Sequence, residues 1–153
     1  MSLINDRLKQ LNIVLPPAPA PAANYVPYVK SNKLIFVSGQ IPVLNGELVT
    51  GKIGKNIEIE DAKTAARLCG LAIVSQLNEA TDLDLDKIKR IVKLGGFVNC
   101  IDEFTQQPEI INGASDLMVE VFGDKGKHSR FAVGTNSLPR NVVVEIEAVA
   151  EIQ

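Results

Sequence analysis

The sequence has few of the residues on which many functional sites depend: its 153 residues include no Trp, one His and two Cys. A single His excludes any site that needs two imidazoles. Cys69 and Cys100 have no further Cys or His at metal-ligand spacing. We expect both thiols to be reduced and largely buried, as in a reducing compartment. The sequence therefore predicts neither a metal site nor a disulfide framework.

An excess of one charge and a long apolar run are also missing. The chain has 16 Lys and Arg residues against 18 Asp and Glu residues, with a formal net charge of −2. This balance does not favour binding to phosphate backbones or to anionic lipid, which depends on clustered cations. Near the N-terminus the longest apolar run is residues 13–15, too short for a signal peptide or a membrane span. We expect a cytoplasmic protein with no nucleic-acid partner and no membrane partner.

The length fits one ordinary domain, which is preceded by a distinct N-terminal segment. Apolar residues at helical spacing predict a short helix over residues 3–12, with Ser2 or Asn5 as its cap. Prolines within residues 15–21 then end any helix and favour an extended connector. We divide the chain into residues 1–23, the helix and the proline-rich connector, and residues 24–153, the main domain.

The main domain alternates strand and helix patterns in the order strand, strand, helix, strand, helix, strand, strand. The predicted strands are residues 26–29, 34–37, 87–98, 130–138 and 142–152, and the predicted helices are residues 58–79 and 108–122. We expect the second strand to end at Ser38-Gly39 and residues 45–55 to form a loop or an irregular hairpin. Gly95-Gly96 predicts a bulge or a close approach. This order is typical of an α+β fold with both helices on one face of a mixed β-sheet.

Two motifs carry little chemical information. Residues 46–52 match the spacing of a P-loop up to its lysine, but Ile53 stands where a magnesium-binding hydroxyl is required. No nucleotide site is predicted there. His128 lies in a loop rich in Gly and Lys, which predicts an exposed polar residue, with a lone proton shuttle as the alternative.

A strand-ending glycine and an arginine are more informative. Gly39 would let the backbone approach a small ligand closely. Arg130 opens an apolar strand, and its planar guanidinium suits bidentate capture of a carboxylate. From residue chemistry alone, we would favour a structural ion pair for Arg130.

Three segments, in this order along the chain, resemble the signature of the Rid/YjgF family of reactive-intermediate deaminases, which is also labelled endoribonuclease L-PSP-like. They are residues 38–42 (SGQIP), Arg130 with Val133, and residues 138–139 (LP) followed by residues 144–148 (VEIEA). The resemblance runs from about Tyr25 to the C-terminus, and the extra N-terminal segment suggests a divergent subgroup. It implies a chorismate-mutase-like fold and a homotrimer with active sites between subunits. The implied reaction converts enamine or imine intermediates such as 2-aminoacrylate to a 2-oxo acid and ammonia.

The resemblance also assigns catalytic roles. Arg130 falls on the family's carboxylate-binding arginine, and Glu145 falls on the carboxylate that positions the attacking water. Ala132 stands where the best-known members have Cys. Because the resemblance implies that this position contributes its backbone carbonyl, the substitution excludes thiol chemistry there and need not abolish activity. Imine hydrolysis needs a held substrate, a positioned water and a route for protons, so we expect no cofactor.

Further positions are assigned to the substrate pocket. Tyr25 matches a tyrosine that lines the pocket across the subunit interface, with Tyr28 as a nearby competitor. Ser38 and Gly39 match residues beside the substrate nitrogen, and Asn112 matches a pocket asparagine on the second helix. The expected partner is therefore a small carboxylate, either an imine or a 2-oxo acid.

Three functions are compatible with these residues. The first is the enamine/imine deaminase. The second is a non-catalytic trimer whose interface pockets bind a small carboxylate as a sensor or regulator, which would keep Arg130 and not need Glu145. The third is an endoribonuclease, which the acidic balance and the single His make less favourable. For Glu145 and Glu147, which alternate with apolar residues, the alternative to a catalytic role is a pair of solvated strand residues.

Overall fold

The computed structural model describes residues 2–153 and contains one mixed five-stranded sheet. Its strands are β1 (Tyr28–Ser31), β2 (Leu34–Gln40), β5 (Ile88–Asn99), β6 (Ser129–Thr135) and β7 (Val144–Ile152). Their spatial order is β1-β2-β7-β5-β6, in which β5 and β6 are parallel and the other neighbours are antiparallel. A separate hairpin is formed by β3 (Val43–Leu44) and β4 (Glu47–Leu48).

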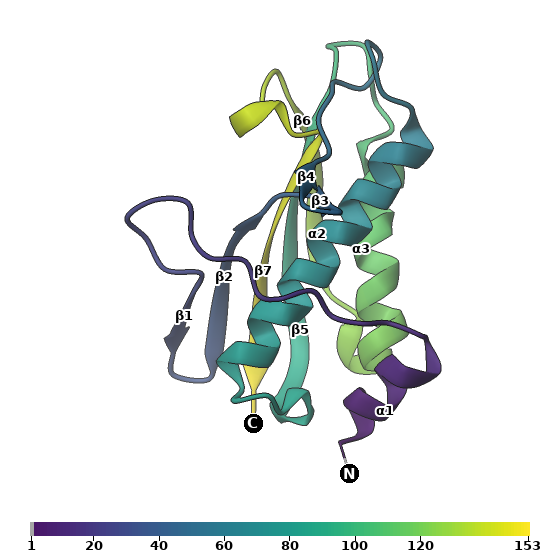
Figure 1. The fold of residues 1–153 in the computed structure, drawn as a ribbon. Coiled ribbons are helices and arrows are strands. Elements are labelled where there is room, and N and C mark those ends of the chain that lie inside the picture. The colour runs from purple at the N-terminus through teal and green to yellow at the C-terminus, as the bar shows by residue number, and fades with distance from the viewer. Residues whose placement is uncertain (1) are drawn as a thin grey trace.

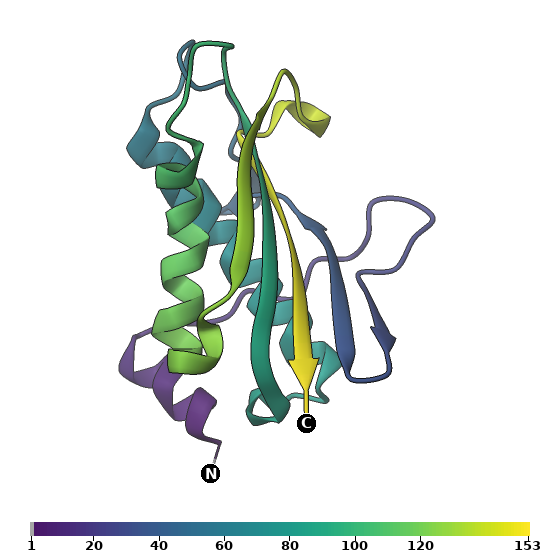
Figure 2. The same cartoon turned by 180° about the vertical axis from the view of Figure 1, so that it is seen from behind.

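The two long helices, α2 (Ile59–Ala80) and α3 (Gln107–Phe122), pack side by side on one face of this sheet (Figure 1). Seen from behind, the other face of the sheet carries no helix (Figure 2). Short 3₁₀ turns complete the chain at η1 (Leu85–Lys87), η2 (Gly123–Gly126) and η3 (Pro139–Asn141). The predicted α+β architecture is confirmed. Among residues 2–153, no helix combines the length and the apolar character needed to span a membrane.

The core lies between the helices and the sheet, and β7 shows how the sequence forms it. Val144, Ile146 and Ala148 are buried toward the helices, whereas Glu145 and Glu147 lie on the opposite face, as the period of two requires. Gly95-Gly96 produces a close approach and not a bulge. A Cβ at Gly96 would lie 2.6 Å from the Ile111 side chain of α3, and the register shifts of β5 fall earlier, between residues 88 and 93. Cys69 and Cys100 are free and buried, as expected.

Several predicted boundaries move. β2 does not end at Ser38-Gly39 but continues to Gln40, which pairs with Ile146 after an irregularity that starts at Val37. The first strand begins at Tyr28, because the preceding Pro27 has no N–H to donate to the ladder. β6 ends at Thr135 and β7 begins at residue 144, so the connection between them is longer than predicted. The P-loop-like segment includes the turn and second strand of the β3–β4 hairpin.

The N-terminal segment forms helix α1 (Leu3–Gln10) and then an extended connector, as predicted. Ser2 caps the helix by accepting a hydrogen bond from the N–H of Asn5 at 3.3 Å. The Asp86 carboxylate accepts two more, from the N–H groups of Leu3 at 2.8 Å and Ile4 at 2.9 Å. Although partial burial opposes the charge, these bonds hold the pKa of Asp86 below its ordinary value of 3.8. The connector then crosses α2 on its way to β1 (Figure 1).

Candidate active site

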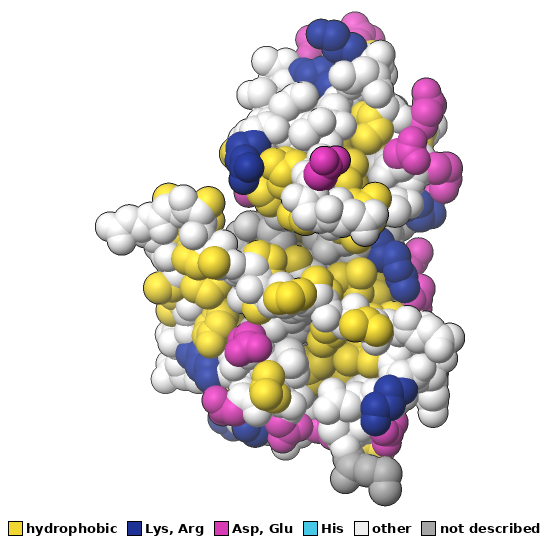
Figure 3. Space-filling view, viewed as in Figure 1, with side chains coloured by type: hydrophobic (Ala, Val, Ile, Leu, Met, Phe, Trp, Pro, Cys, Tyr) yellow, Lys and Arg dark blue, Asp and Glu magenta, His cyan; other side chains and the backbone are white. Residues whose placement is uncertain are grey.

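A pocket of about 340 Å³ lies where β2 ends and β7 begins. Four parts of the chain surround it: the end of the connector with Tyr25, residues 38–41 of β2 and the loop after it, the β3–β4 hairpin, and η3 together with Glu145 of β7. Figure 3 shows a notch between the projecting connector loop at the left and the upper part of the molecule. The topology therefore gathers Tyr25, Ser38, Gly39 and Glu145 around one cavity.

Glu145 is the acidic group of this pocket. Its side chain is half-buried and also borders a smaller opening of about 230 Å³ on the bare face of the sheet, which it shares with Gly39, Phe97 and Glu147. Burial raises the pKa of Glu145 above its ordinary value of 4.5. Among residues 2–153, no Lys, Arg or His forms an ion pair with it. The carboxyl group is therefore unneutralised and more basic than a solvated glutamate.

Gly39 leaves the space that the Glu145 carboxylate occupies. A Cβ at Gly39 would lie 2.9 Å from Oε1 of Glu145, closer than real Cβ contacts come. Only the absence of a side chain lets the Glu145 carboxylate rest against β2. The neighbouring Ser38 donates its hydroxyl to the Val26 carbonyl at 2.7 Å, which joins the connector to β2.

Tyr25 and Tyr28, the two candidates for the pocket tyrosine, have different surroundings. Tyr25 lines the pocket, and its hydroxyl accepts a hydrogen bond from the N–H of Ala22 at 3.4 Å. Tyr28 is partly buried in β1 and packs against the core. Only Tyr25 is therefore placed to contact a ligand beside Glu145.

Arg130 lies elsewhere, between β6 and α3. Its guanidinium donates to Oγ of Ser115 at 3.0 Å and to the carbonyl of Pro108 at 3.4 Å. Within residues 2–153 it forms no ion pair, so the structural ion pair favoured by residue chemistry is wrong. Asn112 follows Pro108 by four residues and precedes Ser115 by three, which puts all three on one side of α3. Ala132 lies two residues after Arg130 and shares its face of β6.

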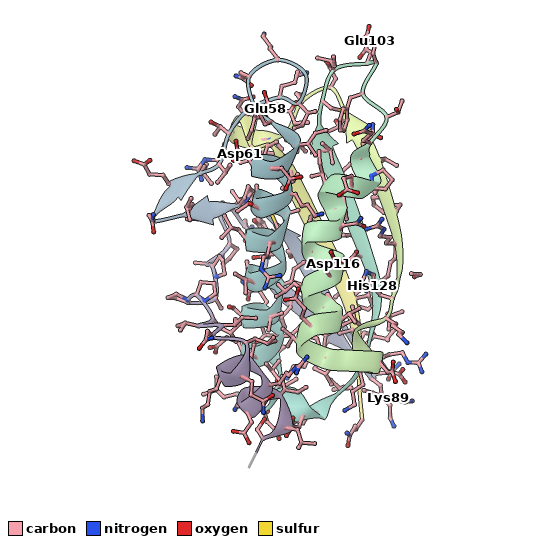
Figure 4. The ribbon with its side chains drawn as sticks, turned by 90° about the vertical axis from the view of Figure 1, so that its right-hand side faces the viewer. Glu58, Asp61, Lys89, Glu103, Asp116 and His128 are labelled. Atoms are coloured by element: carbon pink, nitrogen blue, oxygen red, sulfur yellow. The ribbon has the colours of Figure 1, made fainter. Side chains whose placement is uncertain are left out.

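Ser115 and His128 extend this cluster. Nδ1 of His128 lies 2.6 Å from the carbonyl oxygen of Gly126, and its Nε2 lies 2.9 Å from Oγ of Ser115. Because a carbonyl only accepts, Nδ1 carries a proton, and in the neutral ring Nε2 then accepts from the Ser115 hydroxyl. That hydroxyl in turn accepts from Arg130. Figure 4 shows His128 beside α3, on the side of β6.

His128 is thus half-buried and bonded through both ring nitrogens, so the predicted exposed residue is wrong. Sequence reasoning also missed Ser115. Its spacing of three residues from Asn112 is the one feature of the sequence that would have pointed to it.

The two groups of residues cannot meet on one substrate within one chain. Arg130 pairs with Leu94 of β5 and points toward the helices, whereas Glu145 pairs with Phe97 of β5 and lies on the bare face. Two strand spacings and three residues along β5 separate their backbones by roughly 14 Å, from about 4.8 Å per strand and about 3.3 Å per residue. Each chain therefore carries two separate candidate half-sites.

Comparison with known proteins identifies the family of this chain. The family model described as "YjgF/chorismate mutase-like, putative endoribonuclease" matches residues 5–152. The chain belongs to this YjgF family. The membership expected from the sequence is confirmed, together with the chorismate-mutase-like fold.

Three YjgF relatives place the chain within the family. The protein TCP17 of Trypanosoma cruzi is 46% identical over 147 residues, which cover 95% of this chain and 91% of that protein. The crystal structure of Atu1372 from Agrobacterium tumefaciens, described as having unknown function, is 46% identical with a TM-score of 0.91, over 98% of this chain and 92% of that one. The structure of E. coli TdcF with bound serine is 26% identical with a TM-score of 0.63, over 89% and 94%.

The coverage of each match shows how much of this chain has a counterpart in a relative. A match to 98% of the 153 residues leaves only about three residues outside it, so α1 and the connector have counterparts in Atu1372. A match to 89% leaves more of the chain unmatched in TdcF. The segment is therefore not peculiar to this chain.

Proposed function

We propose that the protein hydrolyses enamine and imine intermediates such as 2-aminoacrylate to 2-oxo acids and ammonia, at sites formed between the subunits of a homotrimer. The observation that carries this proposal is the division of the chain into two half-sites. One holds a half-buried carboxylate with a raised pKa in a pocket, and the other holds an arginine without an acidic partner among residues 2–153. A neighbouring subunit would bring the second half-site of one chain to the first half-site of another.

The bare face of the sheet supports assembly. Val29, Phe36, Phe97 and Val133 are each 37–51% exposed. Strand pairing places them on the face of Glu145: Val29 opposes Phe36, and Phe97 opposes both Val133 and Glu145. An exposed apolar face of this kind is typical of a surface that binds another copy of the chain. Light scattering should give three times 16.5 kDa, and a stable monomer would contradict the proposal.

The chemistry follows from the two half-sites. Arg130 holds the substrate carboxylate through its planar fork of N–H donors. Protonation of the enamine at its methylene carbon gives the imine. A water oxygen then bonds to the imine carbon while Glu145 takes one of its protons. Glu145 then gives this proton to the nitrogen. The C–N bond breaks as the hydroxyl oxygen forms the carbonyl and releases its proton to solvent, which replaces the proton taken up by the methylene carbon, and the nitrogen leaves as ammonia.

The raised pKa of Glu145 suits this role, because a general base works best when its pKa lies near the working pH. The carboxylate must still be ionised to accept the proton, so only a moderate shift is useful.

The direct test is ammonia release from freshly generated 2-aminoacrylate. Glu145→Gln should keep the trimer and lose about 10²- to 10⁴-fold in turnover, the usual contribution of a general base. Glu147→Gln is the matched control, since Glu147 lies on the same face of β7 but does not line the larger pocket. Arg130→Lys should lose most activity while staying folded, because an ammonium cannot reproduce the bidentate fork. Equal and small effects of the two glutamate substitutions would refute the catalytic assignment.

Mixed trimers test whether the site spans two subunits. A site with Arg130 from one chain and Glu145 from another is intact when the first chain carries Glu145→Gln and the second carries Arg130→Lys. Random co-assembly of these two inactive variants should therefore restore roughly a quarter of the wild-type sites. Activity that stays at the level of the separate variants would place both residues in one chain's site or outside it.

The serine bound to TdcF supports a second candidate, a non-catalytic trimer that binds a small carboxylate. Serine is a stable amino acid and contains no imine. Calorimetry with a 2-oxo acid separates the two functions. The sensor would be established, and the deaminase excluded, if the wild type binds the 2-oxo acid without turning over any imine and Arg130→Lys loses that binding.

A further inference from the structure

The connector between α1 and β1 is held firmly against the domain. Ser75 and Gln76 of α2 are 3% and 1% exposed, and each donates a side-chain hydrogen bond of 2.7 Å to a connector carbonyl, at Pro16 and Pro19 respectively. Beyond the pocket, Ser38 fixes the far end through Val26. Because a buried polar group without a hydrogen-bond partner is costly, Ser75 and Gln76 hold the connector against α2 in the folded protein.

Residues 19–22 of this connector form one wall of the pocket that holds Glu145. Their sequence is Pro-Ala-Pro-Ala, and the two prolines have no N–H to offer a ligand. The opposite wall includes Val43 and Leu48 of the β3–β4 hairpin. Figure 3 shows hydrophobic side chains on both sides of the notch. Away from Glu145, the lining is mainly apolar and suits a hydrocarbon group.

The pocket is also larger than the smallest family substrate needs. Its volume of about 340 Å³ falls at the lower end of the range of roughly 300–1,000 Å³ for small-molecule sites. A molecule of six heavy atoms such as 2-aminoacrylate replaces no more than about six waters, roughly 180 Å³ at about 30 Å³ each. Nearly half of the volume is left for a further substituent.

Most of the connector lies on a different part of the surface from the proposed subunit contact, and the two meet at the pocket that holds Glu145. The connector crosses α2 on the helix-covered side (Figure 1), whereas the apolar contact surface lies on the bare face of the sheet (Figure 2).

From these observations we infer that residues 19–22 form a specificity wall, which selects 2-imino acids whose side chain is apolar and larger than a methyl group. The inference rests on the proposed deaminase function and adds the substrate class. Glu145 acts at the imine carbon, and the side chain of the substrate packs between the connector and the β3–β4 hairpin. The prolines fix the backbone of the wall beforehand, so little further ordering is required on binding.

The experiment compares two imines that an amino-acid oxidase generates in the assay, one from alanine and one from leucine. We expect kcat/KM for the leucine-derived imine to be at least about 10-fold higher, since one methylene in an apolar pocket is worth roughly 10- to 200-fold. Ala20→Phe, which narrows the pocket, should lower kcat/KM for the leucine-derived imine more than for the alanine-derived imine, and so remove this preference. Ala23→Phe is the matched control, since Ala23 follows the wall without lining the pocket, and it should keep the preference.

The outcomes separate the inference from the function on which it rests. Equal turnover of the two imines by wild type, or an equal effect of Ala20→Phe and Ala23→Phe on their ratio, would overturn the specificity wall and leave the deaminase standing. A higher kcat/KM for an aspartate-derived imine would also overturn it, and would point to Arg140 at the pocket as the selecting group. No turnover of any imine would instead refute the proposed function.

Discussion

The contact between Gly39 and Glu145 allows a prediction in which stability and activity change in opposite directions. In Gly39→Ala the new Cβ would lie 2.9 Å from Oε1 of Glu145, against about 3.4 Å for an ordinary contact. The carboxylate must therefore move by about 0.5 Å. Since a misplacement of about 1 Å can lower a rate about 10²-fold, we expect kcat/KM to fall about 10-fold, which corresponds to about 1.4 kcal/mol.

The fold should tolerate the same change. Gly39 does not have a positive φ, so alanine brings no backbone strain, and the atom that it meets is the end of a flexible side chain. Alanine also restricts the unfolded chain, which stabilises a protein by about 0.4–1 kcal/mol at a compatible site. The melting temperature should therefore stay the same or rise slightly while kcat/KM for 2-aminoacrylate falls.

A double-mutant cycle decides whether the loss acts through Glu145. In a Glu145→Gln background the general base is already absent, so adding Gly39→Ala should lower kcat/KM little further. Gly95→Ala serves as a comparison, because its Cβ would lie 2.6 Å from the Phe131 ring and 2.8 Å from Oε1 of Glu147, and so disturbs the same face without touching Glu145. A role for Gly39 in positioning Glu145 is refuted if Gly39→Ala keeps wild-type kcat/KM, or if it lowers kcat/KM by the same factor in the Glu145→Gln background as in the wild type.

Three further predictions follow from hydrogen bonds and burial. Because burial raises the pKa of Glu145, the acid limb of the pH profile of kcat/KM should have its midpoint above pH 4.5 and should disappear in Glu145→Gln. The same raised pKa stabilises the fold below pH 4.5, and this contribution to stability is lost as the pH rises through the folded pKa. Ser115→Ala removes a hydrogen-bond acceptor of Arg130, so KM should rise about 10-fold with kcat less affected, whereas an unchanged KM would deny it a positioning role. Asp86→Asn should lower the free energy of unfolding in urea by about 1 kcal/mol at pH 7. The effect should become small once the pH has fallen below the folded pKa, which lies under 3.8, because the carboxylate's contribution is lost as the pH falls through that pKa.

The parts of the fold that depend on local pattern were predictable from the sequence. The alternation around Glu145 and Glu147 placed both on the face opposite the core of β7, and the apolar stripes gave both long helices. Boundaries moved where pairing with a distant strand decided them. Gln40 extends β2 because it pairs with Ile146, and no local feature of Ser38-Gly39 announces that partner.

The interactions of the half-sites were harder to predict for the same reason. The bonds from Arg130 to Ser115 and from Ser115 to His128 depend on how β6 packs against α3, which the residues of β6 alone do not specify. The connector's place at the pocket depends on hydrogen bonds from Ser75 and Gln76, 57 to 59 residues away in the sequence. Proline content predicts an extended connector, but it does not predict what that connector will cover.

The separation of the two half-sites is a consequence of the architecture. When helices cover one face of a sheet, side chains on opposite faces of that sheet cannot reach the same small molecule. Arg130 faces α3 and Glu145 faces away from it, so a substrate held by one within a single chain is beyond reach of the other. Packing the bare, apolar face against other copies would bury exposed Phe36 and Phe97, and it is the step that we propose brings an arginine to each carboxylate. On this view the assembly that stabilises the sheet also completes the site, so a substitution that weakens the interface should lower activity without any contact with the substrate.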